Sequence, residues 1–448
     1  MREAPWAAWS PAEAWQPYEA SVDAPWDVRR AAHLLRRAGF GYTRKQLADS
    51  VKRGPMATVK SLVEAHPDEA FNQNVRSLAD SVVAGGEPRN LSAWWLYRML
   101  HSPAPLLEHM TLFWHGHFAT SGSKVPDARL LLAQHDLFHE HALGDFRDLA
   151  QGISRDPAML LYLDSATNRR SHPNENFARE LLELFCLGVG NYSEHDIQQL
   201  ARCFTGWEVR NGAFRFNRFQ HDRGEKEFFG RKGAFSGEQA VDVVLEQPSV
   251  AAFLVRKIVQ EFVADEPQID DAYLAPLVEK FRASRLDLGA LMTTVLGSRA
   301  MLERPPIGYK VRSPIEFAVG WLRSMDATTN LQALANDLSQ LGQLLFFPPN
   351  VKGWPGGRAW INSTTLAGRA NLIRRLLADS TTKFGGATFD EWVARQRWPD
   401  SVATIEGLAS LWFAVVPSDM TIAELAKLSS PPAGAAHAMS LLPEMHLA

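Results

Sequence analysis

The sequence predicts a mostly α-helical protein, a globular multi-helix bundle with one small β-hairpin and long ordered loops. Apolar residues recur at helical spacing along most of the chain. The one clear hairpin pattern is the Asn211-Gly212 turn, with alternating apolar residues on both sides. Two glycine-rich stretches, 219–237 and 347–363, interrupt the helical period and predict long loops. With 448 residues, 46% of them apolar, the chain can bury a sizeable core.

The elements are expected in the following order. Residues 1–25, rich in Pro, Ala and Trp, predict an N-terminal arm that lies on the body. A helical core domain is expected over 26–378, and a C-terminal helical extension packed on that core over 379–448. Helices are expected within the segments 27–41, 93–102, 105–118, 127–143, 174–190, 193–204, 248–263 and 288–302. The hairpin is expected at 208–216, and the charged segment 219–237 is expected to be an irregular surface loop.

Composition and charge exclude several classes of function. The chain has 47 basic and 50 acidic residues, a net charge of -3, so it lacks the basic surface that nucleic acid or an anionic membrane requires. No apolar run approaches the roughly 18 residues of a membrane span. Its 2 cysteines cannot form a disulfide framework or a thiolate zinc site. The N-terminal segment lacks the pattern of a signal peptide, so a cytoplasmic location is expected.

The segment 112–120, LFWHGHFAT, places two imidazoles one residue apart among large apolar side chains. On an unbroken helix His115 and His117 lie about 160° apart, so they cannot bind the same metal ion. Either the helix ends near Gly116 and both rings converge, or one ring is a ligand and the other is a core histidine with its hydrogen bonds satisfied. Both interpretations remain open from the sequence.

The segment 174–190 predicts a helix with a strongly acidic face. Glu175, Arg179 and Glu183 lie on one side, Glu180 extends that face, and apolar residues fill the opposite side. A solvated face with an i,i+4 pair between Glu175 and Arg179 is one interpretation. The other is a helix that presents carboxylates to a polar cavity, as helical metal enzymes do.

Two further groups have the residue types of metal sites. His221 and Asp222 stand next to each other in the loop after the hairpin, followed by Lys226, and an adjacent His-Asp pair suits hard or borderline divalent metals. His135 and His139 are spaced i,i+4 and could chelate, but the charged residues around them favour an exposed polar face.

Six motifs in order resemble a bacterial family, the domain-of-unknown-function family 1800, over nearly the whole chain. The motifs are HLLRRAGFG, MTLFWHGHFATSGSK, DPAMLLYLDSATN, PNENFARELLELFCLGVGNYSEHDIQQLARCFTGW, HDRGEKEFFGRKGAFSG and PPNVKGWPGGRAWIN. The resemblance implies a mostly helical protein, often encoded beside a second family, domain-of-unknown-function 1501, that is itself similar to sulfatases and alkaline phosphatases. The family pattern includes His115, His117, Glu175, Arg179, Glu180, Glu183, His221, Asp222 and Lys226. Cys186, His135 and His139 fall outside the family pattern, which argues against these three residues as ligands. Many relatives carry export signals, and this sequence shows none.

These observations predict a metal-dependent enzyme. We expect a divalent metal (iron, zinc, manganese or copper) held by His115 and/or His117, Glu180, His221 and Asp222. Glu175 or Glu183 would act as the base, while Arg179 and Lys226 would hold an anionic group of the substrate. Oxidative chemistry on a peptide or small metabolite is favoured, and hydrolysis of an ester or phosphate is the alternative.

A non-enzymatic role is the third hypothesis. In that case the polar motifs form a buried hydrogen-bond network, and the loop at 347–363 is a docking surface. Trp354 and Trp360 would be its anchors, because aromatic residues are enriched at interface hot spots. The partner would be a protein of the domain-of-unknown-function 1501 family.

Overall fold

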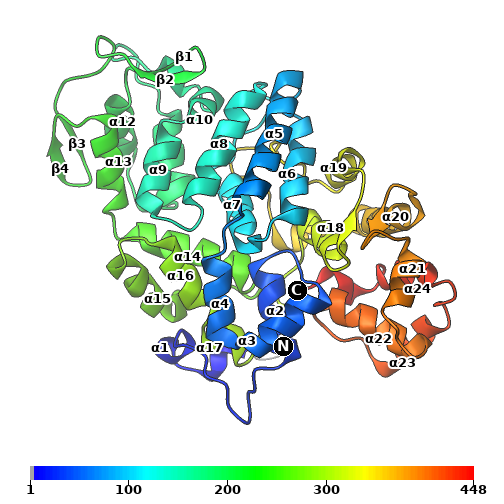
Figure 1. Ribbon diagram of the computed structural model, residues 1–448. Coiled ribbons are helices and arrows are strands. Elements are labelled where there is room, and N and C mark those ends of the chain that lie inside the picture. Colours follow the sequence, from blue (N-terminus) through cyan, green and yellow to red (C-terminus); the bar gives the residue numbers. More distant parts are fainter. Residues whose placement is uncertain (1–4) are drawn as a thin grey trace.

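The computed structural model describes residues 5–448, and in this part of the chain helices dominate, as the sequence predicts. The first half contains α1 (Pro11–Ala14), α2 (Val28–Ala38), α3 (Arg44–Arg53), α4 (Pro55–Val63), α5 (Glu69–Gly85), α6 (Asn90–His101), α7 (Pro105–His117), α8 (Ala128–His141), α9 (Phe146–Ser154), α10 (Pro157–Tyr162), α11 (Asn176–Glu180) and α12 (Glu194–Cys203). The second half contains α13 (Gly237–Leu245), α14 (Ser249–Phe262), α15 (Asp271–Ala283), α16 (Leu288–Leu296), α17 (Arg299–Leu302), α18 (Pro314–Arg323), α19 (Leu331–Gln340), α20 (Ser363–Ala378), α21 (Phe389–Arg395), α22 (Ser401–Trp412), α23 (Asp419–Ala426) and α24 (Pro432–Met439). Figure 1 places α7 near the centre of the molecule.

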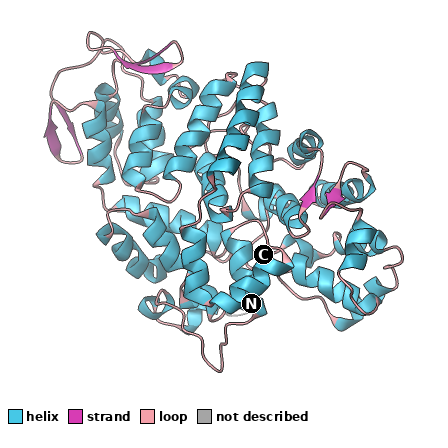
Figure 2. Ribbon diagram, viewed as in Figure 1, coloured by secondary structure: helices cyan, strands magenta, loops and turns pink. Residues whose placement is uncertain are grey.

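The strands form three two-stranded antiparallel sheets at the periphery of the helical body (Figure 2). They are β1 (Trp207–Arg210) with β2 (Ala213–Phe216), β3 (Lys226–Phe228) with β4 (Arg231–Gly233), and β5 (Ala327–Thr328) with β6 (Lys383–Phe384). The first pair is the predicted hairpin, with Asn211 at φ 53° and Gly212 at φ 73° in its turn.

The second hairpin lies inside the segment 219–237, where we expected only irregular structure. Its turn is Phe229-Gly230, with both residues at positive φ, 48° and 69°. Phenylalanine rarely adopts positive φ, so no common turn dipeptide marks this hairpin in the sequence. The helix expected over 288–302 is also interrupted, because Ser298 caps a new helix, α17, through its hydroxyl and the Met301 N–H.

Two large clusters of buried apolar side chains form most of the core, and α7 contributes to both. Trp114 belongs to the first cluster and Leu112 to the second. The predicted N-terminal arm joins the first cluster through Trp6 and Trp15, while residues 1–4 of that arm lie outside the described residues. The C-terminal helices belong to the second cluster, for example through Trp412.

No helix between residues 5 and 448 is both long enough and apolar enough to cross a bilayer.

Candidate functional site

His115, Gly116 and His117 form the HGH motif. Its two histidines project from one continuous helix, since α7 runs through Gly116 to His117. His115 is buried among aromatic rings, and its Nε2 accepts the backbone N–H of Phe346 at 3.0 Å. Burial lowers the pKa of His115 to about 3, so the ring is neutral. The neutral form fits its role as an acceptor, and this histidine anchors the backbone at Phe346.

His117 has different partners. Its Nε2 donates to the Phe185 carbonyl at 2.9 Å, and its Nδ1 accepts from Lys257 Nζ at 3.1 Å. Burial, and then the nearby Lys257 charge, hold the pKa of His117 well below its usual value. Both ring nitrogens therefore have protein partners.

The charged side chains of the acidic helix predicted over 174–190 contact different neighbours. Arg179 pairs with Glu175 at 3.1 Å and with Glu194 at 2.7 Å. Glu183 accepts the Tyr192 hydroxyl at 3.0 Å. Glu180 is half-buried, and burial followed by the neighbouring Glu183 charge raises its pKa. The backbone changes from α-helix to a π-helix at Leu181–Cys186, which rotates the following side chains relative to a regular helix.

The loop after the first hairpin is held together by its own polar groups. Asp222 pairs with Arg202 at 2.7 Å, and His221 Nδ1 donates to the Thr205 carbonyl at 2.9 Å. Lys226 is buried and donates to the carbonyls of Asp222 and Phe235. These contacts fix the second hairpin against α12.

The structure does not bring the five predicted metal ligands together. His115, His117 and the His221-Asp222 pair have the separate partners described above, and Glu180 belongs to no cluster of possible ligands among residues 5–448. In residues 5–448, the one group of three or more His, Cys, Asp or Glu side chains whose ligand atoms all lie within 4.8 Å is His109, Glu261 and Glu316. The candidate site is therefore elsewhere. Of the four expected catalytic side chains, Glu175, Arg179 and Glu183 bind neighbours on or near their own helix, and Lys226 is a hairpin anchor.

Two members of the new cluster, Glu261 and Glu316, line a cavity of about 200 Å³ between α7, α14, α18 and the loop that precedes α20. His109 lies behind this lining and reaches it through Glu261. One end of this cavity is acidic. His109 Nε2 donates to Glu261 Oε1 at 3.1 Å, and Glu316 Oε1 lies 3.9 Å from the same nitrogen. Asp265, just after α14, adds a third carboxylate to the lining.

Lys310 lies among these carboxylates. Its Nζ is 3.5 Å from Glu261 Oε2, 3.8 Å from Asp265 Oδ1 and 4.0 Å from Glu316 Oε1. Burial lowers the pKa of Lys310, but the three carboxylates outweigh it and raise that pKa overall. Burial raises the pKa of Glu261, yet Lys310 and His109 together bring it down to about 2. Both groups are therefore charged at neutral pH.

The lining also includes basic and aromatic side chains. Lys257 reaches the cavity beside His117, and burial lowers its pKa to about 8. Lys352 is exposed at the edge of the cavity. Trp354 is half-buried and Trp360 is buried, and both line the same space.

The HGH motif supports the loop that covers this cavity. His115 binds the loop backbone at Phe346, as described, and the ring of Trp354 lies 5.5 Å from the ring of His115. Gly353 has φ 75°, and a Cβ there would lie 2.2 Å from the Gly116 carbonyl oxygen. The loop backbone therefore packs directly against the end of α7, which only a glycine at position 353 permits.

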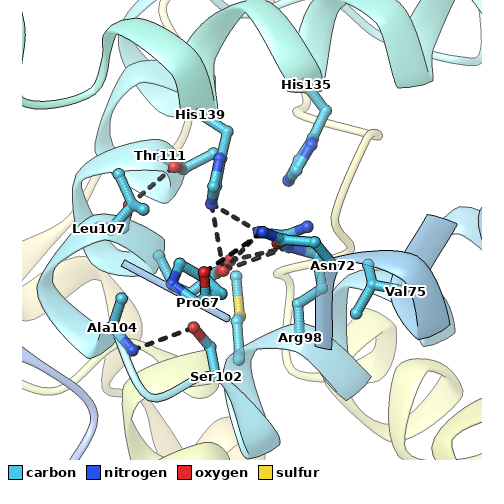
Figure 3. A network of polar contacts seen from close by, with 12 residues as sticks. Pro67, Asn72, Val75, Arg98, Ser102, Ala104, Leu107, Thr111, His135 and His139 are labelled. Carbon is cyan, nitrogen blue, oxygen red and sulfur yellow. Dashed lines mark hydrogen bonds and ion pairs between the residues drawn. The ribbon is translucent and has the colours of Figure 1, made fainter. Parts of the chain in front are cut away.

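A second buried polar network lies between α6, α7 and α8 (Figure 3). Arg98 pairs with Glu108 at 2.8 Å, and His139 Nε2 lies 3.4 Å from the same carboxylate oxygen. Figure 3 shows His139 pointing into this network from α8. His135, one turn earlier, is 1% exposed, so the expectation of an exposed polar face is wrong for this residue.

Sequence reasoning missed the residues of the acidic end. His109 lies inside the helix expected over 105–118, four residues after its first position, but no second histidine stands near it to attract attention. Glu316 also completes the capping box of α18 with Ser313, which is a sufficient local explanation for a glutamate there. One signal in the sequence could have indicated the acidic end of the cavity. Lys257, Glu261 and Asp265 follow one another every four residues in a mostly apolar segment, a spacing that places residues on one face of a helix.

Comparison with known proteins gives one match. The family model described as "Protein of unknown function (DUF1800)" matches residues 33–446. Searches of the curated proteins and of the solved structures found no match to this chain.

Proposed function

The chain belongs to the DUF1800 family, and from this premise we propose that it is a metal-dependent enzyme whose centre is the acidic end of the cavity. The observation that carries the proposal is the convergence of His109, Glu261 and Glu316, with all three ligand atoms within 4.8 Å. These side chains come from α7, α14 and α18, so the tertiary fold is needed to assemble them.

The chemistry of the donor set fits a divalent metal. One imidazole nitrogen and two carboxylates suit iron, manganese or zinc, and this set discriminates poorly between them. Copper fits less well, because two of the three donors are carboxylates. Glu316 is buried and Glu261 is half-buried. Carboxylates removed from water are costly unless they are paired or bind a cation, so their clustering supports a cation site.

Lys310 is the natural competitor for a metal at this position. Its ammonium already lies within 4.0 Å of three carboxylates. A divalent ion carries twice its charge and binds carboxylate oxygens directly, whereas the ammonium is 3.5 Å or more from each of them. We expect the side chain of Lys310 to move aside when a metal binds, and the proton on His109 Nε2 to be lost or to shift to Nδ1, which has no hydrogen-bond partner.

Oxidative chemistry on a peptide or small metabolite remains the favoured reaction class. When bound, the metal would supply redox or Lewis-acid chemistry at the acidic end. The chain's own groups would hold the substrate, since the rings of Trp354 and Trp360 supply apolar walls and the cavity of about 200 Å³ suits a small molecule or the end of a peptide.

Hydrolysis of an ester or phosphate is the second candidate. It is favoured by Lys257 and Lys352, two ammonium groups that line the cavity and could neutralise an anionic substrate.

The scaffold hypothesis loses its proposed anchors, because Trp354 and Trp360 both face the cavity and Trp360 is 7% exposed. A partner of the domain-of-unknown-function 1501 family is compatible with an enzyme and is tested by co-purification.

Metal content tests the proposal. Purified protein incubated with iron, manganese or zinc and then desalted should retain about one ion per chain, measured by plasma mass spectrometry. Glu261→Gln and Glu316→Gln should each reduce retention by roughly tenfold or more, because each removes a charged ligand. Glu183→Gln is the control, since that carboxylate bonds to Tyr192 outside the cavity, and it should retain the metal.

Equal retention by wild type, Glu261→Gln and Glu316→Gln would contradict the proposed centre. Loss of metal from the Glu183→Gln control alone would move the site back to the acidic helix.

A further inference from the structure

We propose that Lys257 is an amine nucleophile that forms an imine with a small aldehyde or ketone bound in the cavity. This inference rests on the proposed function in so far as both use the same cavity, and it names the class of substrate. The residue lies on α14, four positions before Glu261, and lines the cavity together with His117.

The surroundings of Lys257 differ from those of the other buried lysine of the cavity. Lys310 has three carboxylates within 4.0 Å. The two hydrogen-bond acceptors of Lys257 are uncharged: Nδ1 of His117 at 3.1 Å and the Leu184 carbonyl at 3.4 Å. Within residues 5–448 it makes no ion pair with a carboxylate, so no neighbouring negative charge holds it as an ammonium.

Burial lowers the pKa of Lys257 to about 8, and Cys186 opposes this only in part. The ring of Phe253, whose centroid is 5.0 Å from Nζ, is the other group that favours the ammonium. Roughly a tenth of the side chain is then a neutral amine with a free lone pair at pH 7. Lysines used in imine chemistry are activated by desolvation of this kind.

His117 is a positioning residue for this amine. Because its Nε2 donates to the Phe185 carbonyl, its Nδ1 carries no proton and can only accept. The Leu184 carbonyl accepts a second N–H. These two acceptors fix the direction of the amine and leave its remaining position for the cavity.

The reaction balances without a further reactant. The neutral amine nitrogen bonds to the carbonyl carbon, and one of its two protons moves to the carbonyl oxygen, which gives a carbinolamine. The second nitrogen proton then passes to that hydroxyl as the C–O bond breaks, so the oxygen leaves as water and an imine joins Lys257 Nζ to the substrate carbon. A hydride from added cyanoborohydride reduces this bond to a stable secondary amine, which can be mapped.

The experiment treats the full-length protein with acetaldehyde and sodium cyanoborohydride at pH 7 and follows each lysine by peptide mass mapping. Lys280 on α15 is exposed and serves as the internal reference. Lys257 should be modified at least about tenfold faster than Lys280, because burial lowers the pKa of Lys257 and its neutral amine is the reactive form. Mapping of the wild-type chain needs no variant, so the result does not depend on the folding of a mutant.

Variants separate this inference from the metal proposal. Lys257→Met should abolish the fast adduct and keep the metal, whereas Glu316→Gln should lose the metal and keep the fast adduct. His117→Gln should slow adduct formation at Lys257 without changing the rate at Lys280. Modification of Lys257 at or below the rate of Lys280 in the wild-type chain would overturn the proposal, whatever the metal content.

Discussion

At the scale of single residues, the HGH motif (His115-Gly116-His117) supports the loop over the cavity, and its two imidazoles have separate hydrogen-bond partners. His115 accepts the Phe346 N–H, Gly116 packs against Gly353, and His117 orients Lys257. Each histidine is tolerated in its apolar surroundings because a hydrogen bond satisfies it. The sequence could predict that His117 needs a polar partner, but the partner is a lysine 140 positions away, which spacing cannot reveal.

His135 gives a prediction about stability and pH. Burial lowers its pKa to about 4, and neither ring nitrogen has a hydrogen-bond partner of good geometry. In the unfolded chain the ring binds a proton below about pH 6.5, while the folded protein keeps it neutral down to about pH 4. Stability from this group is therefore complete above pH 6.5 and is lost as the pH falls toward 4.

His135→Phe should remove this dependence. Between pH 6.5 and 5 the free energy of unfolding should fall by about 2 kcal/mol less in the variant than in the wild type. Urea denaturation at the two pH values measures the difference. His195→Phe, at an exposed ring, should leave the dependence unchanged. An identical loss in His135→Phe and wild type would refute the assignment of a buried neutral ring.

At the scale of elements, local patterns predict helices well and the positions of polar groups poorly. The helices α7, α8, α12 and α14 begin and end close to the predicted limits, because their apolar spacing is local and because α8 and α12 also have side-chain caps. The acidic helix shows the limit of such patterns. Its charged face is real, but Arg179 turns to Glu194 on α12 and Glu183 turns to Tyr192, contacts that depend on how the chain folds back.

The loop before α20 gives a prediction about its packing. Gly353→Ala should destabilise the protein by roughly 1–3 kcal/mol, because the new Cβ meets the Gly116 carbonyl and the residue must keep a positive φ. Gly356→Ala is a matched control, since it also has a positive φ, 69°, but no atom within 4 Å of the added Cβ.

Urea denaturation and hydrogen exchange over residues 347–360 measure both effects. Gly353→Ala should cost more than Gly356→Ala and should raise exchange across the loop. Equal costs would mean that the loop does not pack on α7 as described.

At the scale of the whole molecule, the fold class follows from helical spacing, but the assembly of the site does not. The cavity is built by α7, α14, α18 and a loop, and their residues span positions 109 to 360. Sequence reasoning assigned the metal to motifs rich in His, Asp and Glu. The structure shows that the converging set has one histidine and two glutamates, each isolated in its own segment.

The C-terminal helices give a prediction about the domain organisation. Trp412 on α22 donates to Ser324 Oγ, and its ring lies 5.7 Å from that of Trp321 on α18. Removing residues 379–448 would expose this part of the second core cluster. We expect the 1–378 fragment to aggregate or to lose cooperative thermal unfolding, as measured by calorimetry and light scattering. A monomeric fragment with a sharp transition would instead show that 379–448 is a dispensable extension.

The central claim is that His109, Glu261 and Glu316 form a metal centre, and anomalous X-ray scattering from crystals soaked with manganese or zinc tests it most directly. We predict a strong anomalous peak about 2.0–2.2 Å from His109 Nε2 and from a carboxylate oxygen of each glutamate, with the Lys310 ammonium displaced. Metal peaks only at other positions, with Lys310 still among the carboxylates, would contradict the account.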